Sequence, residues 1–168
     1  MFVLGGLSKS CGLPQFKLAW LAVCGPKRDR KEALARLEII ADTYLSVSSP
    51  VQRAAPALLH RLPELQQPIL RRVRGNHAYL QTALAGTPAS PLASQGGWSA
   101  VVRLPATVSE EERTCRLIEE RGVCVHPGFF FDFPREAYVV LSLLPPEETF
   151  QRGVTQIVAE LAVEQHSS

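Results

Sequence analysis

Two lysines near the start of the chain have the residue type and spacing that amine chemistry needs. They lie in residues 4–20, LGGLSKSCGLPQFKLAW, where Lys9 comes just beyond an apolar segment and Lys17 stands eight residues later, before the next one. A lysine held in a water-poor pocket beside a second cation becomes an amine nucleophile. The same pair also fits two solvated lysines that flank a tight connection, because lysines are mostly exposed. The spacing alone leaves both readings open.

The elements that would position these lysines are two short apolar segments, residues 2–7 and 18–24. Each is rich in β-branched or aromatic residues and is bounded by glycine and proline, which predicts a strand in both places. Their apolar character is continuous, as in strands of a sheet that is covered on both faces. Because a stable sheet normally needs three or more strands, two strands followed only by helices predict the incomplete end of a larger domain.

The rest of the chain alternates between helical spacing and further short strands. Predicted helices cover residues 30–45, a segment that starts at Pro50, a long segment from about residue 64, residues 109–120 and a last amphipathic segment around residues 154–161. Ser109 and Glu112 form a capping box at the start of the fourth of these helices. Predicted strands are residues 98–104, 123–126 and 138–144, and the Gly/Pro/Ser-rich residues 86–97 predict a linker.

The lysine segment resembles a known cofactor-binding motif. Residues 8–14 (SKSCGLP), a cation at position 17 and Trp20 are similar to the cofactor-lysine motif of class I/II aminotransferases, which have the fold type I of aspartate aminotransferase. The resemblance implies that Lys9 forms a Schiff base with pyridoxal 5'-phosphate and then shuttles protons. It also implies that Ser8 and Lys17 bind the cofactor phosphate.

The C-terminal half carries a second part of the same resemblance. Residues 125–128 (VHPG), followed by the three phenylalanines 129–131, resemble the family's V-x-P-G-x-x-F loop, and residues 141–150 resemble its closing strand and helix. The resemblance covers nearly the whole chain but only the C-terminal part of the family fold. It implies an α/β protein in which residues 1–46 are the incomplete end of the fold-type I large domain. Residues 47–168 would be a helical connection and an α+β small domain.

Three positions depart from the family pattern. The family usually has arginine where this chain has Lys17, and a lysine lacks the bidentate fork that arginine offers to phosphate. Gly6 stands where many members have serine. The arginine that binds the substrate carboxylate in the family aligns with Val140. Either Arg135 takes over the carboxylate or the substrate class differs, and Arg135 also fits an ordinary solvated surface charge.

The family residues that hold the cofactor ring precede the lysine, so none is assigned in this chain. We therefore expect a C-terminal fragment of an aminotransferase that acts on an amino acid and a 2-oxo acid, and that forms a homodimer when intact. The alternatives are a non-catalytic remnant that no longer binds pyridoxal phosphate and a pyridoxal-phosphate-dependent lyase or decarboxylase, which the valine at position 140 makes conceivable. An upstream extension that encodes the ring-binding residues would favour the enzyme over the remnant.

Composition excludes several other classes of protein. A formal net charge of +2 in 168 residues does not point to a nucleic-acid partner. The N-terminus has no basic region of a signal peptide, and no apolar run is long enough to span a membrane, so we expect a cytoplasmic protein. The four cysteines show no metal-ligand spacing, so no metal is predicted, and we expect reduced, partly buried thiols.

Overall fold

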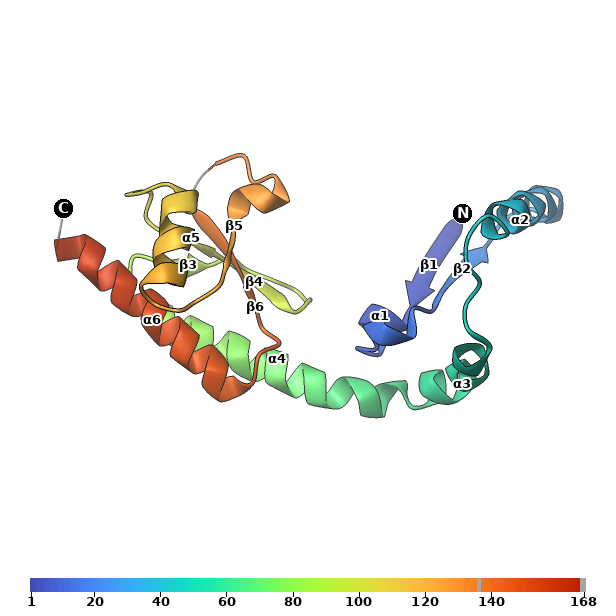
Figure 1. The fold of residues 1–168 in the computed structure, drawn as a ribbon, viewed down its shortest axis with the longest axis horizontal. Helices are drawn as coiled ribbons and strands as arrows, with labels where there is room; N and C mark the ends of the chain where they lie inside the picture. Colours follow the sequence, from blue (N-terminus) through green and yellow to red (C-terminus); the bar gives the residue numbers. More distant parts are fainter. Residues whose placement is uncertain (136, 167–168) are drawn as a thin grey trace. The chain divides into compact units, whose positions relative to one another are not determined.

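The computed structural model describes residues 1–135 and 137–166, with the side chains of all of these except residues 165 and 166. The chain forms two compact units, Met1–Ile69 and Leu70–Ser168 (Figure 1). The division falls within one long helix, α4 (Leu62–Leu84). Our predicted boundary at residue 46 concerns the domains of the longer family fold and stays a prediction.

The first unit begins with an antiparallel hairpin. Strand β1 (Phe2–Gly6) pairs with β2 (Ala19–Val23), and the register runs from Phe2 opposite Val23 to Gly6 opposite Ala19. Between the strands lie a single helical turn, α1 (Leu7–Ser10), and a 3-10 turn, η1 (Pro14–Phe16). The two strands predicted from the apolar segments are confirmed.

The predicted burial of these strands is wrong. Leu4 is 76% exposed, Phe2 54% and Val3 46%, and most of β2 is exposed as well. Within residues 1–135 and 137–166, β1 and β2 pair only with each other. A two-stranded ribbon that no third strand joins keeps much of its apolar surface in solvent, even though α2 contacts β2.

Three helices follow the hairpin. They are α2 (Lys27–Ala41), α3 (Ser49–His60) and the start of α4. Helix α2 begins and ends earlier than the predicted helix 30–45. It begins earlier because Pro26 is its N-cap. It ends earlier because the chain leaves the helix at residue 42, after which the N–H groups of Thr43 and Tyr44 form turn hydrogen bonds. The helix predicted from Pro50 and the long helix predicted from residue 64 are confirmed to within two residues.

The second unit is built around a four-stranded antiparallel sheet. Its strands are β3 (Ser90–Pro91), β4 (Ser99–Arg103), β5 (His126–Pro127) and β6 (Tyr138–Ser142), in the order β3-β4-β6-β5. Helices α5 (Glu110–Glu119), α6 (Glu147–His166) and the end of α4 accompany the sheet, and a 3-10 turn, η2 (Gly128–Phe131), follows β5 (Figure 1). The core joins side chains from all three helices and both central strands: Leu80, Leu84, Val102, Leu117, Val139, Leu141, Phe150, Val154, Ile157 and Leu161.

Two predictions in this unit are corrected by strand pairing. The predicted linker contains β3, whose Pro91 lies on the sheet edge, where a residue without an N–H is tolerated. Of the predicted strand 123–126, only His126 pairs with β6, together with Pro127 beyond it. The Ser109 half of the predicted capping box of α5 is confirmed. Ser109 Oγ accepts a hydrogen bond from the Glu112 N–H at 3.1 Å.

Buried ion pairs tie α5 and the turn after it to α6. Arg113, 2% exposed, lies 2.5 Å from the Glu164 carboxylate and also donates to the Pro105 carbonyl and the Thr107 hydroxyl. Arg121 lies 3.0 Å from the Glu160 carboxylate. Arg113 and Arg121 each have a carboxylate partner, which offsets the cost of burying their charge.

Candidate functional site

The end of the β1–β2 hairpin positions Ser8 and Lys17. The N–H of Leu7 donates to the carbonyl of Leu18 at 3.0 Å, which extends the hairpin by one pair beyond Gly6 and Ala19. Ser8 directly follows this closing pair and Lys17 directly precedes it. The Ser8 and Lys17 side chains therefore lie at the same end of the hairpin, although eight residues separate them in the sequence.

Helix α1 turns Lys9 to solvent. Leu7 is fully buried and Cys11, one helical turn later, is 2% exposed, so these two side chains define the inner face of the turn. Lys9 lies between them in sequence and is exposed. The Lys9 side chain thus lies on the exposed face of the turn, whereas Leu7 and Cys11 anchor the turn by its apolar face.

The beginning of α4 fixes this turn within the first unit. The side-chain amide of Gln66 donates to the Ser10 carbonyl at 2.8 Å. Gly12 has φ +66°, and a Cβ placed there would lie 2.5 Å from Cδ1 of Ile69. Only glycine meets both the backbone conformation and the close approach without strain.

Lys17 has an unusual backbone conformation. Its φ of 51° and ψ of 37° lie in the left-handed region, at the end of η1, where its N–H donates to the Pro14 carbonyl at 3.3 Å. For a residue other than glycine this conformation costs about 1 kcal/mol. Strained backbone of this kind is frequent at ligand-binding positions.

In the second unit, the segment after β5 is held by a buried carboxylate that the sequence did not reveal. Glu110, 3% exposed, accepts the N–H of Phe129 at 2.9 Å and the N–H of Tyr138 at 2.7 Å. A Cβ on Gly128 would lie 2.8 Å from Glu110 Oε1 and 2.9 Å from the Tyr138 Cβ. Glu110 thereby anchors both ends of the segment that contains Arg135. Its sequence signal, an acid in the first turn of a helix, is also that of an exposed dipole-stabilising residue.

The remaining residues singled out by sequence also lie in the second unit. Val140 is a buried residue of β6, paired with Val101 on one side and His126 on the other. Arg135 is exposed. The three phenylalanines 129–131 are each more than half exposed. Phe130 and Phe131 lie about 6 Å from the His126 ring, centroid to centroid.

The described residues were also compared with what a membrane span, a metal site and a disulfide require. No helix in the part of the chain that the structure describes is long and apolar enough to cross a membrane. No group of three or more His, Cys, Asp and Glu side chains within residues 1–135 and 137–166 is arranged to hold a metal ion. All four cysteines are free thiols, and Cys11 is the buried one, whereas Cys24, Cys115 and Cys124 are exposed.

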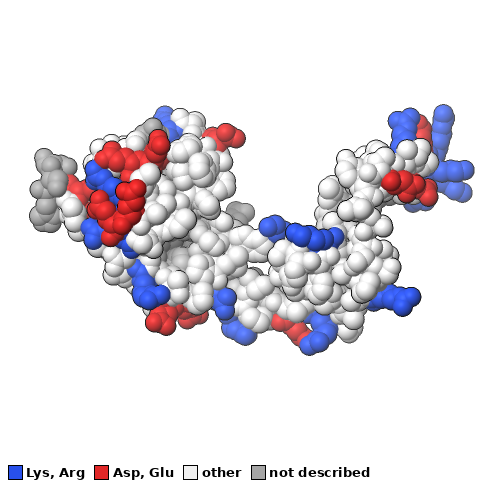
Figure 2. All heavy atoms as spheres, viewed as in Figure 1, with Lys and Arg blue, Asp and Glu red and all other residues white. Residues whose placement is uncertain are grey.

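Charge does not gather into a single-sign patch on the visible face either. Figure 2 shows acidic side chains among the basic ones, both around α2 and around α5. In α2, Arg36 forms an ion pair with Glu32, and in α5, Arg116 forms one with Glu112. This mixed distribution agrees with the formal net charge of +2.

Comparison with known proteins identifies one family. The sequence model described as "Aminotransferase class I and II" matches residues 1–157. No curated protein matches the chain.

Several solved structures have the same fold. An aromatic aminotransferase from Pyrococcus horikoshii superposes with a TM-score of 0.80 at 18% identity, over 98% of this chain and 43% of that one. An alanine aminotransferase from Pyrococcus furiosus gives 0.80 at 20% identity, over 96% and 42%. A probable N-succinyldiaminopimelate aminotransferase from Thermus thermophilus gives 0.77 at 27% identity, over 94% and 41%. The chain therefore spans less than half the length of the structures that it matches.

Proposed function

Because the chain belongs to the class I and II aminotransferase family, we propose that it is part of a pyridoxal-phosphate-dependent enzyme that transfers an amino group between an amino acid and a 2-oxo acid. The observation that carries the proposal is the arrangement of Lys9, Ser8 and Lys17 at one end of the hairpin. An exposed primary amine follows a serine there, and the Leu7–Leu18 hydrogen bond brings that serine and a second cation to the same end.

These residues fit pyridoxal phosphate by their chemistry. The cofactor carries an aldehyde and a phosphate, and the hairpin end offers one amine, one hydroxyl and one ammonium on a backbone held by Gln66 and Ile69. When bound, the cofactor supplies an electron sink for the substrate Cα. Lys9 would hold the aldehyde carbon through Nζ. Once released from that bond, the same Nζ would take the proton of the substrate Cα and return it.

Ser8 and Lys17 would hold the phosphate. The Ser8 hydroxyl would donate a hydrogen bond to it, and the Lys17 ammonium would supply the opposite charge as a point cation rather than a fork. The strained conformation of Lys17 is consistent with a position selected for its contact with a ligand.

The family's arginine for the substrate carboxylate is replaced in this chain by Val140. This valine is buried within β6. We propose Arg135 in the role of that arginine, because this residue is exposed on the segment that Glu110 anchors. Arg135→Gln should raise KM for the amino acid more than it lowers kcat. If Arg135→Gln changes kcat as much as it changes KM, or changes neither, a different substrate class is favoured. A lyase or decarboxylase, which the valine at position 140 makes conceivable, would then be favoured as well.

The intact enzyme is expected to be a cytoplasmic homodimer that binds an amino acid and a 2-oxo acid. Light scattering on the purified protein, with and without pyridoxal phosphate, measures the oligomeric state. A monomer at all concentrations would contradict the predicted dimer, but it would not test the role of Lys9.

The assignment of Lys9 is tested by trapping. The purified chain is incubated with pyridoxal phosphate, its absorbance spectrum is recorded, and the sample is reduced with borohydride and digested for mass spectrometry. A visible absorbance band, and a reduced adduct on the peptide that contains Lys9, are expected. Lys9→Ala should lose both, whereas Lys27→Ala, a change at an exposed lysine of α2, should keep both. Absence of the adduct from the unmodified chain would mean that it is a fragment or a non-catalytic remnant, with the cofactor chemistry in residues that it does not contain.

A further inference from the structure

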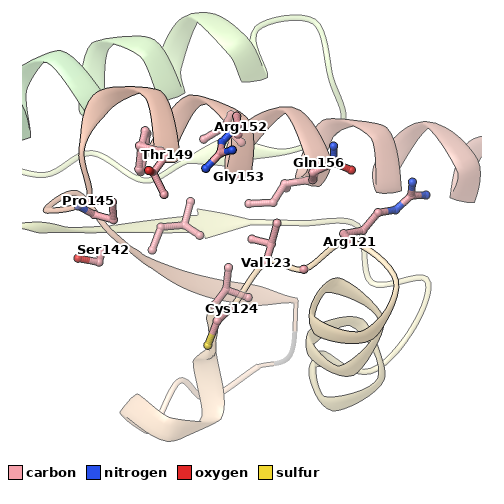
Figure 3. Close-up of a pocket in the computed structure, with 15 residues that line it drawn as sticks. Arg121, Val123, Cys124, Ser142, Pro145, Thr149, Arg152, Gly153 and Gln156 are labelled. Atoms are coloured by element: carbon pink, nitrogen blue, oxygen red, sulfur yellow. The ribbon is translucent and has the colours of Figure 1, made fainter.

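A cavity of about 500 Å³ lies within the second unit, between α6, the end of β6 and the segment before β5 (Figure 3). Its volume falls in the range of small-molecule sites, about 300–1,000 Å³. It contains none of the residues proposed above for cofactor or substrate binding. Figure 3 shows Thr149 on α6 above the cavity and Val123 and Cys124 on the opposite wall.

The cavity exists because β5 leaves β6 early. His126 pairs with Val140 and Pro127 with Val139, so a continued ladder would place Cys124 opposite Ser142. Pairing stops instead, and both Cys124 and Ser142 line the cavity. The interruption opens a space where two more ladder pairs would have stood.

The interruption also directs backbone polar groups into the gap. In β6 the backbone groups alternate between the two neighbouring strands, and the N–H of Leu143 donates to Trp98 on the β4 side. Ser142 therefore presents its N–H and carbonyl to the opposite side, toward the missing pair. Such groups need a hydrogen-bond partner from solvent or from a ligand.

The cavity is lined by apolar side chains and by two arginines, Arg121 and Arg152. Leu141, Val154 and Ile157 give it an apolar floor that belongs to the core. Two guanidinium groups and no carboxylate line it. The Arg121 charge is compensated by Glu160 at 3.0 Å, whereas Arg152 forms no ion pair with any residue that the structure describes. One cation is therefore left unbalanced beside an apolar floor.

We propose that this cavity binds a small organic acid, with its carboxylate at Arg152 and its aliphatic or aromatic body on the apolar floor. Charge complementarity selects an anion, and the cavity volume suits a molecule the size of an aryl-alkanoic acid. The backbone groups of Ser142 give the polar end of the ligand a second partner. The site is separate from the Lys9 chemistry and does not rest on the proposed function.

The test uses 4-phenylbutyrate and its neutral counterpart 4-phenylbutyramide as probes, titrated into isotopically labelled protein and followed by amide NMR. Shifts should concentrate on the cavity residues, with the acid bound up to about fivefold more tightly than the amide, the range of an exposed ion pair. Arg152→Gln should remove this preference and keep binding of the amide. Arg103→Gln, a change at an exposed arginine of β4 outside the cavity, should leave the preference intact.

Filling the cavity gives a second, independent readout. Thr149→Trp should abolish binding of both probes, whereas Thr155→Trp, on an exposed position of α6 that does not line the cavity, should not. If Thr149→Trp does not fold, the acid-to-amide ratio in Arg152→Gln decides. Shifts elsewhere, equal affinity of acid and amide in the unmodified protein, or unchanged binding by a folded Thr149→Trp would each overturn the proposal. Lys9→Ala should bind as the unmodified protein does, so failure of the cavity and failure of the cofactor site are distinguishable.

Discussion

The Glu110 carboxylate accepts the backbone N–H of Tyr138 at 2.7 Å, across 28 residues of sequence. Tyr138 is the first residue of β6, and its N–H points to the side on which β5 has already turned away into η2. The acid thus takes the place of a strand partner at the edge of the sheet. It also accepts the Phe129 N–H, so a single side chain satisfies two backbone donors on both sides of the Arg135 segment.

Glu110→Ala is expected to destabilise the second unit strongly. Two N–H groups lose their charged acceptor, and each buried donor left unsatisfied costs about 1–3 kcal/mol. The free energy of unfolding in urea measures the loss. Glu111→Ala, at an exposed neighbour in the same helical turn, should change it by less than about 0.5 kcal/mol. Equal effects of the two variants would show that the contacts of Glu110 contribute nothing.

Gly128→Ala is expected to be destabilising because its Cβ would lie within 3 Å of both Glu110 and Tyr138. Overpacking of this kind costs about 1–3 kcal/mol. Gly96→Ala, where a Cβ would meet nothing within 4 Å, is the matched control. Since the carboxylate causes part of the clash, Gly128→Ala should cost less in a Glu110→Ala background. Strict additivity in this cycle would argue against the clash.

Lys17→Asn should separate phosphate binding from stability. Asparagine tolerates the left-handed conformation, so the unfolding midpoint should not fall. Affinity for pyridoxal phosphate should fall because the cation is lost, whereas affinity for pyridoxal, which has no phosphate, should not. Lys17→Arg should retain binding of pyridoxal phosphate. Parallel losses for both ligands in Lys17→Asn would mean that this residue does not contact the phosphate.

Arg113→Met should destabilise the second unit by about 3–5 kcal/mol, because it removes the Arg113 guanidinium from the buried Glu164 carboxylate. The double change Arg113→Met with Glu164→Leu should recover most of the loss, since no lone charge remains. Arg116→Ala breaks a more exposed pair with Glu112 and should cost less than about 1 kcal/mol. Thermal unfolding of the unmodified protein, the two single variants and the double variant provides the measurement. A double variant no more stable than Arg113→Met would contradict the prediction.

Local information accounts for what was predicted correctly. The two strands around Lys9, the capped start of α5 at Ser109 and the long helix that became α4 follow from periodicity and turn residues, which act over a few neighbours. The lysine motif itself is a short segment, so its resemblance to a family was visible in residues 8–20 alone.

Long-range contacts decided the rest. The hairpin strands have the composition of buried strands, but no third strand joins them within the described residues, and Leu4 is exposed. The buried role of Glu110 depends on a loop 19 residues away and a strand 28 residues away. The cavity depends on the point at which β5 stops pairing with β6.

The sequence by itself determined most of the helices and the longer strands, and which lysine follows the serine of the family motif, but it missed the short strand β3 and misplaced β5. Only the tertiary structure decided which apolar side chains are covered, where a carboxylate is buried and where the sheet opens into a cavity. The physical reason is that backbone preference is set by nearest neighbours, whereas burial is set by the elements that happen to pack against a residue.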